Sequence, residues 1–264
     1  MFDAHCHLQF EAFDEDREEV LERAREAGVR GLMIADYDGE RRGLAAELSQ
    51  RAGIYATAGL HPWAVAELDQ KGLSEALKEL EAVLEEPCWS GLGELGLDYY
   101  RVKDDQSREV QRKAFVAQLG MARERNLPVV IHAVRAHNSL IGLLREEGLP
   151  EAGGILHGYS GSARQVGTFL MMNLDISIGT AVTFENRKRL EEVVRQVPED
   201  RLLVETDAPD RPPGERSGER NEIAYLPEVM EAVAGLRSCS VERIAAMTER
   251  NLRARFRLGD EQLE

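Results

Sequence analysis

Eight short apolar runs, each followed by an amphipathic run, span this chain of 264 residues. Short apolar runs bounded by turn residues are typical of buried strands, and apolar residues at every third or fourth position are typical of helices. The apolar runs lack polar alternation, as expected for a parallel sheet that is covered on both faces. Eight strand–helix units in about 250 residues predict an α/β fold of the TIM (β/α)8 barrel type.

The expected elements alternate along the whole chain. The strands are Phe2–His7, Val29–Ala35, Ile54–His61, Trp89–Glu94, Pro128–His132, Gly154–His157, Leu174–Ile178 and Leu202–Asp207. The helices are Asp16–Ala27, Glu40–Arg51, Ser74–Glu85, Asp105–Arg125, Ala136–Glu146, Ala163–Met172, Glu185–Gln196, Ile223–Gly235 and Val241–Phe256. No linker, repeat or low-complexity stretch interrupts them, so we expect residues 1–264 to form a single domain.

The composition narrows the possible partners and compartment. A net charge of −15 argues against a broad basic surface that coats duplex DNA, but not against a pocket in which metal ions hold a phosphate. No apolar run is long enough to span a bilayer, and the N-terminus does not resemble a signal peptide. Cys6, Cys88 and Cys239 are scattered, which favours the reducing cytoplasm. We expect a cytoplasmic protein without membrane contacts; the sequence gives no indication of its oligomeric state.

Uncommon polar residues recur where the expected strands end. His5 and His7 end the first strand and lie on the same face, roughly 6.6 Å apart at their Cα atoms. Five further strand ends carry His61, Glu94, His132, His157 and Asp207. The C-terminal strand ends of a parallel barrel lie on one rim, where barrel enzymes perform their chemistry. Five of the six histidines and two carboxylates are therefore expected at one mouth.

Four of these imidazoles and both carboxylates predict a site for two divalent metal ions, because they exceed what one ion needs. We assign them to two ions that share Glu94: His5, His7, Glu94 and Asp207 for one, and Glu94, His132 and His157 for the other. The mixed ligands suit Zn²⁺, Mn²⁺ or a similar ion, and their spacing does not choose among these. Two ions about 3.5–4 Å apart can activate water and stabilise the leaving oxygen of a phosphate ester. We expect Asp207 and Glu94 to be catalytic, with Asp207 holding the water and accepting its proton.

Three further residues each have two interpretations. His61 is favoured as a contact to a substrate phosphate, with a structural hydrogen bond as the alternative. Glu205 either orients a metal ligand or is a buried structural carboxylate. Arg135 either binds a substrate phosphate or begins a solvated helix.

Gly91, Gly93 and Gly96 match the spacing of the dinucleotide-binding fingerprint GxGxxG. That fingerprint requires a helix that opens directly at the glycines. Here the next helical pattern begins only near Asp105. We therefore expect the glycines to let the backbone pass close to metal and substrate.

Ordered motifs along nearly the whole chain resemble those of the TatD family of metal-dependent hydrolases. The motifs are Asp3–His7, Gly59–Pro62, Gly93–Tyr99, Leu127–His132, His157–Ser162, Leu203–Pro209, Asn221 and Asn251–Leu252. The resemblance implies a TIM barrel with a divalent-metal site at the ligands named above. It also implies phosphodiester hydrolysis of the deoxyribonuclease type, on single-stranded DNA or RNA ends or another nucleotide-like substrate held in a pocket.

Two departures from the family pattern keep other functions open. Members of the family usually carry Arg where this chain has Val134, and an aromatic residue where it has Asp210. The alternative is a metal-dependent hydrolase of another ester or an amide, such as an aminoacyl-tRNA deacylase or a small-molecule esterase. Many amide and ester hydrolases of related barrels bridge their metals with a modified lysine on the fourth strand, where this chain has Glu94. A barrel that only binds metal or a partner should lack a ligand, and none is missing.

Overall fold

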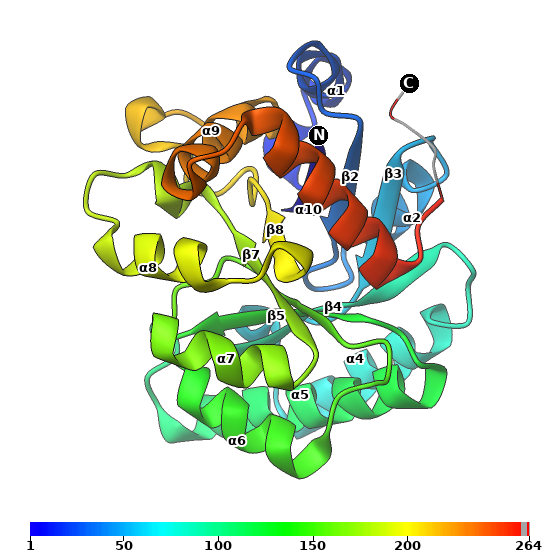
Figure 1. Cartoon of the computed structure of the whole chain (residues 1–264). Coiled ribbons are helices and arrows are strands. Elements are labelled where there is room, and N and C mark those ends of the chain that lie inside the picture. The colour runs from blue at the N-terminus through cyan, green and yellow to red at the C-terminus, as the bar shows by residue number, and fades with distance from the viewer. Residues whose placement is uncertain (260–262, 264) are drawn as a thin grey trace.

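The chain forms a barrel of eight parallel strands with helices around it (Figure 1). The computed structural model describes residues 1–259 and 263. The strands lie side by side in chain order from β1 to β8. This arrangement confirms the predicted TIM barrel. The single domain expected for residues 1–264 stays a prediction, and its residues 260–262 and 264 lie outside the described part.

The elements alternate as expected. The strands are β1 (Phe2–Cys6), β2 (Gly31–Ala35), β3 (Ile54–Ala58), β4 (Trp89–Asp98), β5 (Val129–Val134), β6 (Gly154–Leu156), β7 (Leu174–Ile178) and β8 (Leu202–Val204). The α-helices are α1 (Arg17–Glu26), α2 (Arg42–Leu48), α3 (Pro62–Ala66), α4 (Gln70–Val83), α5 (Asp105–Arg125), α6 (His137–Glu147), α7 (Ala163–Met171), α8 (Lys188–Gln196), α9 (Leu226–Arg237) and α10 (Val241–Phe256). Short 3-10 helices are η1 (Glu11–Phe13), η2 (Thr180–Thr183), η3 (Glu199–Arg201), η4 (Gly214–Arg216) and η5 (Ile223–Tyr225).

Local capping explains two differences from the expected helices. The helix expected from Ser74 begins at Gln70, because the Asp69 side chain accepts a hydrogen bond from Gly72 N at 2.7 Å and caps it. The short helix α3 was not expected. It begins after His61, whose Nδ1 accepts from Trp63 N at 3.1 Å, and Pro62 suits its first turn.

Strand β4 is longer than expected, so Glu94 lies in its middle and not at its end. The strand continues to Asp98 and pairs with β5 along the extension, where Gly96 lies opposite His132. Gly96 has a φ of 154°, and a Cβ atom there would collide with the His132 carbonyl group. The structure thus shows Gly96 packed against β5, where we expected an approach to metal and substrate. The continuous strand also leaves no place for a dinucleotide-binding helix.

The barrel closes between the two ends of the chain. Strand β8 ends at Val204, three residues before the expected Asp207. The segment after it still pairs with β1: Asp207 N donates to His5 O at 3.0 Å, and His7 N donates to Ala208 O at 2.7 Å. The fully buried Asp3 carboxylate strengthens this contact by accepting from Thr206 N at 2.9 Å and Thr206 Oγ1 at 2.5 Å. Burial raises the pKa of Asp3 to about 7, against these hydrogen bonds.

Two apolar clusters hold the barrel together. The larger one lies between the strands and the outer helices. The smaller one joins inward-facing residues of the strands to helix α10, which crosses in front of the strands in Figure 1. Its members are Phe2, Ala4, Met33, Val130, Ile155, Leu203, Leu252 and Phe256. The interior is therefore a packed core, which leaves the opposite end of the barrel for polar side chains.

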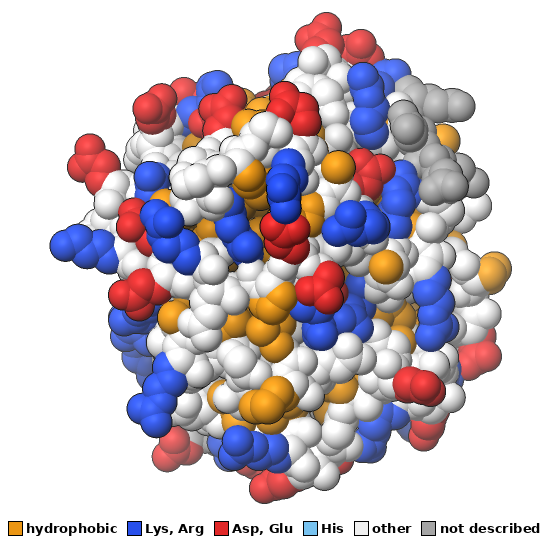
Figure 2. Space-filling model, viewed as in Figure 1, with side chains coloured by type: hydrophobic (Ala, Val, Ile, Leu, Met, Phe, Trp, Pro, Cys, Tyr) orange, Lys and Arg blue, Asp and Glu red, His pale blue; other side chains and the backbone are white. Residues whose placement is uncertain are grey.

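The side of the molecule that carries α10 has no broad patch of basic residues among the described residues (Figure 2). Figure 2 shows acidic and basic side chains interspersed over that side of the molecule. Among the residues that the structure describes, no helix is both long enough and apolar enough to cross a membrane.

A buried ion pair fixes the turn after β2. Arg42 Nε donates to Asp36 Oδ2 at 2.5 Å, and Arg42 Nη2 donates to Gly59 O at 3.2 Å. The backbone of the same turn supports the rim, because Asp36 O accepts from Glu94 N at 3.1 Å and Tyr37 O accepts from His61 N at 2.6 Å. The pair therefore stabilises both the fold and two side chains of the rim.

Replacing Asp36 by Ala should lower the free energy of unfolding by about 3–5 kcal/mol, because it leaves the Arg42 guanidinium buried without its carboxylate. Denaturant titration followed by circular dichroism measures this change. The control is Glu75→Ala, which removes an exposed ion pair with Lys71 of 3.5 Å and should cost less than about 1 kcal/mol. Equal losses in the two variants would contradict a structural role for the buried pair.

Candidate metal centre

The six predicted ligands lie together at the C-terminal end of the barrel. They come from five strands or the residues just after them: His5 from β1, His7 after β1, Glu94 from β4, His132 from β5, His157 after β6 and Asp207 after β8. All are buried except Asp207, whose side chain is 33% exposed. Asp207 is therefore the ligand that solvent or a substrate can reach.

Glu94 lies at the centre of this group. Its Oε2 is 3.2 Å from His5 Nε2 and 3.4 Å from His7 Nε2. Its Oε1 faces three other imidazole nitrogens: His157 Nε2 at 2.7 Å, His132 Nδ1 at 2.8 Å and His61 Nε2 at 3.2 Å. The two oxygens of one carboxylate thus have different nearest imidazoles, and His5 and His157 also lie close enough to share an ion with Glu94.

Asp207 completes the group on the Oε2 side. Its Oδ1 lies 3.5 Å from His5 Nε2 and 3.6 Å from His7 Nε2. Its backbone has a φ of 59°, a value that few non-glycine residues adopt. His5, His7 and Asp207 each offer a ligand atom, and these atoms lie within 4.8 Å of one another.

His61 lies among the expected ligands, although we expected it outside the ligand set. Its Nε2 points to Glu94 Oε1 and is 3.4 Å from His132 Nδ1, while its Nδ1 caps α3. With Glu94 and His132 it forms a further group of possible ligands. The structure therefore shows the structural hydrogen bond that was the alternative interpretation of His61, and its contact to a substrate phosphate stays a prediction.

The buried polar atoms fit a metal ion. Among the described residues, the buried Glu94 Oε2, which faces His5 and His7, has no hydrogen-bond partner. Such atoms are costly to bury, because they lose their contacts with water. The nitrogen and oxygen donors around Glu94 are those that Zn²⁺ and similar ions prefer. A cation between these groups would satisfy both carboxylates.

The electrostatics of the centre also indicate a need for positive charge. Burial alone would raise the pKa of the Glu94 carboxyl, but the His157 and His61 imidazoles hold it well below its usual range. Burial opposes a charge on His7 too, yet hydrogen bonds to Asp207 and Glu94 raise its pKa to about 10. Burial lowers the pKa of His61 to about 4. Protons and metal ions thus compete for the same positions between the carboxylates and the imidazoles.

Glu205 lies behind the ligand His157, next to the ring nitrogen that faces away from Glu94. The carboxylate is fully buried, and it accepts from Gly158 N and from Ser177 Oγ, each at 2.5 Å. Its Oε1 also lies 3.4 Å from His157 Nδ1. A carboxylate behind a histidine orients the ring and increases its basicity as a metal ligand.

Asp98 occupies the same position behind His132, and our sequence analysis missed it. Its Oδ2 is 3.2 Å from His132 Nε2 and accepts from Trp63 Nε1 at 2.7 Å. Its Oδ1 accepts from the backbone N of Tyr100 and of Arg101, each at 2.8 Å. The period of two along a strand could have identified Asp98, because it lies on the same face of β4 as Glu94.

Arg135 was expected to contact the substrate. Within the described residues, it makes no hydrogen bond to any of the six predicted metal ligands. It has a φ of 54°, and its guanidinium lies over the ring of Tyr100 at 4.6 Å. Tyr100 is 56% exposed. The pair is therefore open to solvent, and the expected phosphate contact of Arg135 stays a prediction.

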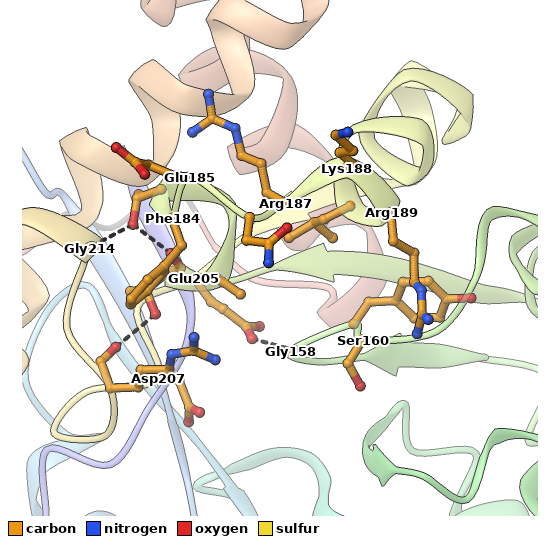
Figure 3. A pocket seen from close by; sticks show the side chains of 18 of the residues that line it. Gly158, Ser160, Phe184, Glu185, Arg187, Lys188, Arg189, Glu205, Asp207 and Gly214 are labelled. Carbon is orange, nitrogen blue, oxygen red and sulfur yellow. Dashed lines mark hydrogen bonds between the residues drawn. The ribbon is translucent and has the colours of Figure 1, made fainter.

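A cleft of about 1100 Å³ adjoins the centre (Figure 3). Glu205 and Asp207 line it at the centre, and the rest of its lining comes from Val134 at the end of β5 and from the segments after β6, β7 and β8. A substrate in this cleft would reach Asp207, the exposed ligand. The arrangement combines buried ligands with one open side, as a hydrolytic metal site requires.

Known proteins resemble this chain over nearly its whole length. Residues 2–257 match the family described as TatD related DNase. The chain is 37% identical over 260 residues to the uncharacterized metal-dependent hydrolase YabD of Bacillus subtilis, covering 98% of this chain and 100% of YabD. It is 35% identical over 269 residues to a protein of Erwinia amylovora named 3′-5′ ssDNA/RNA exonuclease TatD, covering 98% of this chain and 100% of that protein.

A solved structure agrees with the sequence comparisons. The crystal structure of YjjV, a TatD homolog from Escherichia coli, superposes with a TM-score of 0.89 and 30% identity over 98% of each chain. The resemblance inferred from the motifs is thus confirmed. The chain belongs to the TatD family of metal-dependent hydrolases.

Proposed function

We propose that the protein hydrolyses phosphodiester bonds at the ends of single-stranded DNA or RNA with two divalent metal ions. The observation that carries this proposal is the Glu94 carboxylate, whose two oxygens have different nearest imidazoles. The similarity to proteins named 3′-5′ ssDNA/RNA exonuclease supports the choice of substrate.

Two ligand sets follow from this geometry. His5, His7 and Asp207 would hold one ion together with Glu94 Oε2, and His132 and His157 would hold the other together with Glu94 Oε1. His61 lies beside the second set, where it could contact either the ion or a substrate phosphate. Divalent ions in these positions would activate a water molecule and neutralise charge on the phosphate.

Asp207 is the residue that we propose as the base. Its Oδ1 faces His5 and His7, which leaves Oδ2 to hold the attacking water and accept its proton. Its partial exposure lets water and substrate reach it, whereas Glu94 is buried and serves to hold the two ligand sets together. Glu205 and Asp98 would act as positioning residues for His157 and His132.

The remaining features agree with a substrate that is bound locally. A net charge of −15 disfavours extended contacts with duplex DNA, so the end of a single strand is the proposed substrate. Cys6, Cys88 and Cys239 are all free thiols, which supports action in the cytoplasm.

Chelation tests the proposed function most broadly. Dialysis against EDTA should abolish the release of nucleotides from labelled single-stranded DNA or RNA, and Zn²⁺ or Mn²⁺ should restore it. The same ions should raise the unfolding temperature, because they bind only the folded chain. Metal-loaded protein that cleaves charged tRNA or small esters but no DNA or RNA would refute the proposal.

Replacing Asp207 by Asn should lower kcat on single-stranded DNA by about 10²–10⁴-fold, because the amide cannot accept the proton. Rates measured at saturating metal and substrate report this step. The control is Asp200→Asn, an exposed carboxylate beside β8 that has no role in the site, which should keep the wild-type rate. Retained activity in folded, metal-loaded Asp207→Asn would exclude Asp207 as the base.

Replacing Glu205 by Gln should weaken metal binding by about 10–100-fold, because the amide orients His157 less strongly. Competition with a coloured chelator measures the affinity. The fold should persist, since the amide oxygen can still accept from Gly158 N and the Ser177 hydroxyl can rotate to accept from the amide N–H. Unchanged affinity would show that Glu205 is only a structural carboxylate.

A further inference from the structure

The cleft beside the metal centre is larger than the cleavage of one bond requires. Its volume of about 1100 Å³ exceeds the roughly 300–1000 Å³ of common small-molecule pockets. It begins at Asp207 and Glu205 and extends past the Gly158–Gly161 loop to the start of α8 (Figure 3). The cleft therefore has room for more than the two groups that flank a single phosphodiester.

Basic side chains line this cleft although the chain is strongly acidic overall. Apart from Glu205 and Asp207 at the centre, its charged lining consists of four cations and two anions: Arg187, Lys188, Arg189, Arg211, Glu185 and Glu215. Arg187 has a carboxylate partner, Glu191, at 3.4 Å. Within the described residues, no ion pair joins Lys188, Arg189 or Arg211 to a carboxylate, and all three are exposed. These cations are available to an anionic ligand.

Arg211 is held in a geometry that suits nucleic acid. Its guanidinium lies over the Phe184 ring at 4.2 Å, and its carbonyl group accepts from Thr180 Oγ1 at 2.7 Å. Stacking orders the guanidinium and leaves its N–H groups free for a phosphate. An aromatic ring beside a cation is also the usual support for an unpaired base.

Arg189 lies on the other wall of the cleft. In Figure 3 its side chain extends toward the loop that carries Ser160, and both residues line the cleft. Burial lowers the pKa of His137, which stacks edge-on against Tyr159 of that loop, and the charges of His132 and Arg189 lower it further. Arg189 and Arg211 therefore flank the path that leads to Asp207.

We propose that this cleft binds the nucleotides that adjoin the scissile bond on the retained strand, with Arg189 and Arg211 holding their phosphates. This inference rests on the nucleic-acid substrate proposed above. It makes the protein selective for chains over small diesters, because only a chain occupies both the metal centre and the cleft.

The test compares a single-stranded DNA oligonucleotide with bis(p-nitrophenyl) phosphate on metal-loaded protein. In Arg189→Ala and in Arg211→Ala, the ratio of kcat/KM for the oligonucleotide to that for the small diester should fall about 10-fold or more, through KM. The slope of log KM against log salt concentration should decrease by about 0.7 for each arginine removed. The control is Arg195→Ala, an exposed arginine at the other end of α8, which should keep the wild-type ratio and slope.

The outcomes separate the two proposals. If wild-type protein cleaves both substrates and neither arginine variant changes the ratio or the slope, the cleft proposal is wrong and the nuclease proposal stands. The cleft proposal is also wrong if Arg195→Ala matches the two variants, because the effect is then one of net charge. If metal-loaded wild-type protein cleaves no single-stranded DNA or RNA, both proposals are overturned.

Discussion

Closure of the barrel between β1 and the segment after β8 is the constraint on which the metal centre depends. His5 and Asp207 come from opposite ends of the chain, and the bond from Asp207 N to His5 O places them side by side. The buried Asp3 carboxylate reinforces this contact through both polar atoms of Thr206. A chain that failed to close here would still form most of its strands, but it would separate His5 and His7 from Asp207.

Closure has a cost, because it brings two carboxylates and five imidazoles together at the mouth of the barrel, and all of them except Asp207 are buried. Glu94 is surrounded by imidazole nitrogens and retains an oxygen without a hydrogen-bond partner. Positive charge must therefore come from protons or from metal ions, and the ligand types favour metal. The rest of the scaffold serves this demand: Asp98 and Glu205 orient histidines, and the turn after β2 fixes the backbone of Glu94.

The sequence was sufficient to predict the barrel and to predict that the six ligands lie together. The alternation of strands and helices implies a parallel barrel, in which the C-terminal ends of all strands lie on the same rim. His132 and Asp207 are therefore expected to lie together although they are far apart in the chain. The ends of strands were less predictable, because they depend on the partner strand and not on local residues. Strand β4 continues past Glu94 because it pairs with β5 there. Strand β8 stops at Val204, and the segment after it forms hydrogen bonds with β1.

Side-chain roles beyond the strand ends were the least accessible from sequence. Asp98 was missed because β4 was expected to end before it, and His61 was placed outside the ligands because the other six residues were enough to complete both ions. The partners of Arg135 and Arg211 are aromatic rings from other loops, and loop packing leaves no periodic pattern in a sequence. These residues lie where a substrate approaches the centre, so their geometry had to come from the structure.

We propose that Glu94 divides the mouth of the barrel into two cation positions. Anomalous diffraction from crystals of the protein loaded with Zn²⁺ or Mn²⁺ tests it most directly. We expect two peaks that share Glu94, one beside His5, His7 and Asp207 and the other beside His132 and His157. A single peak, or a pair of peaks of which either lies out of contact with Glu94, would contradict it.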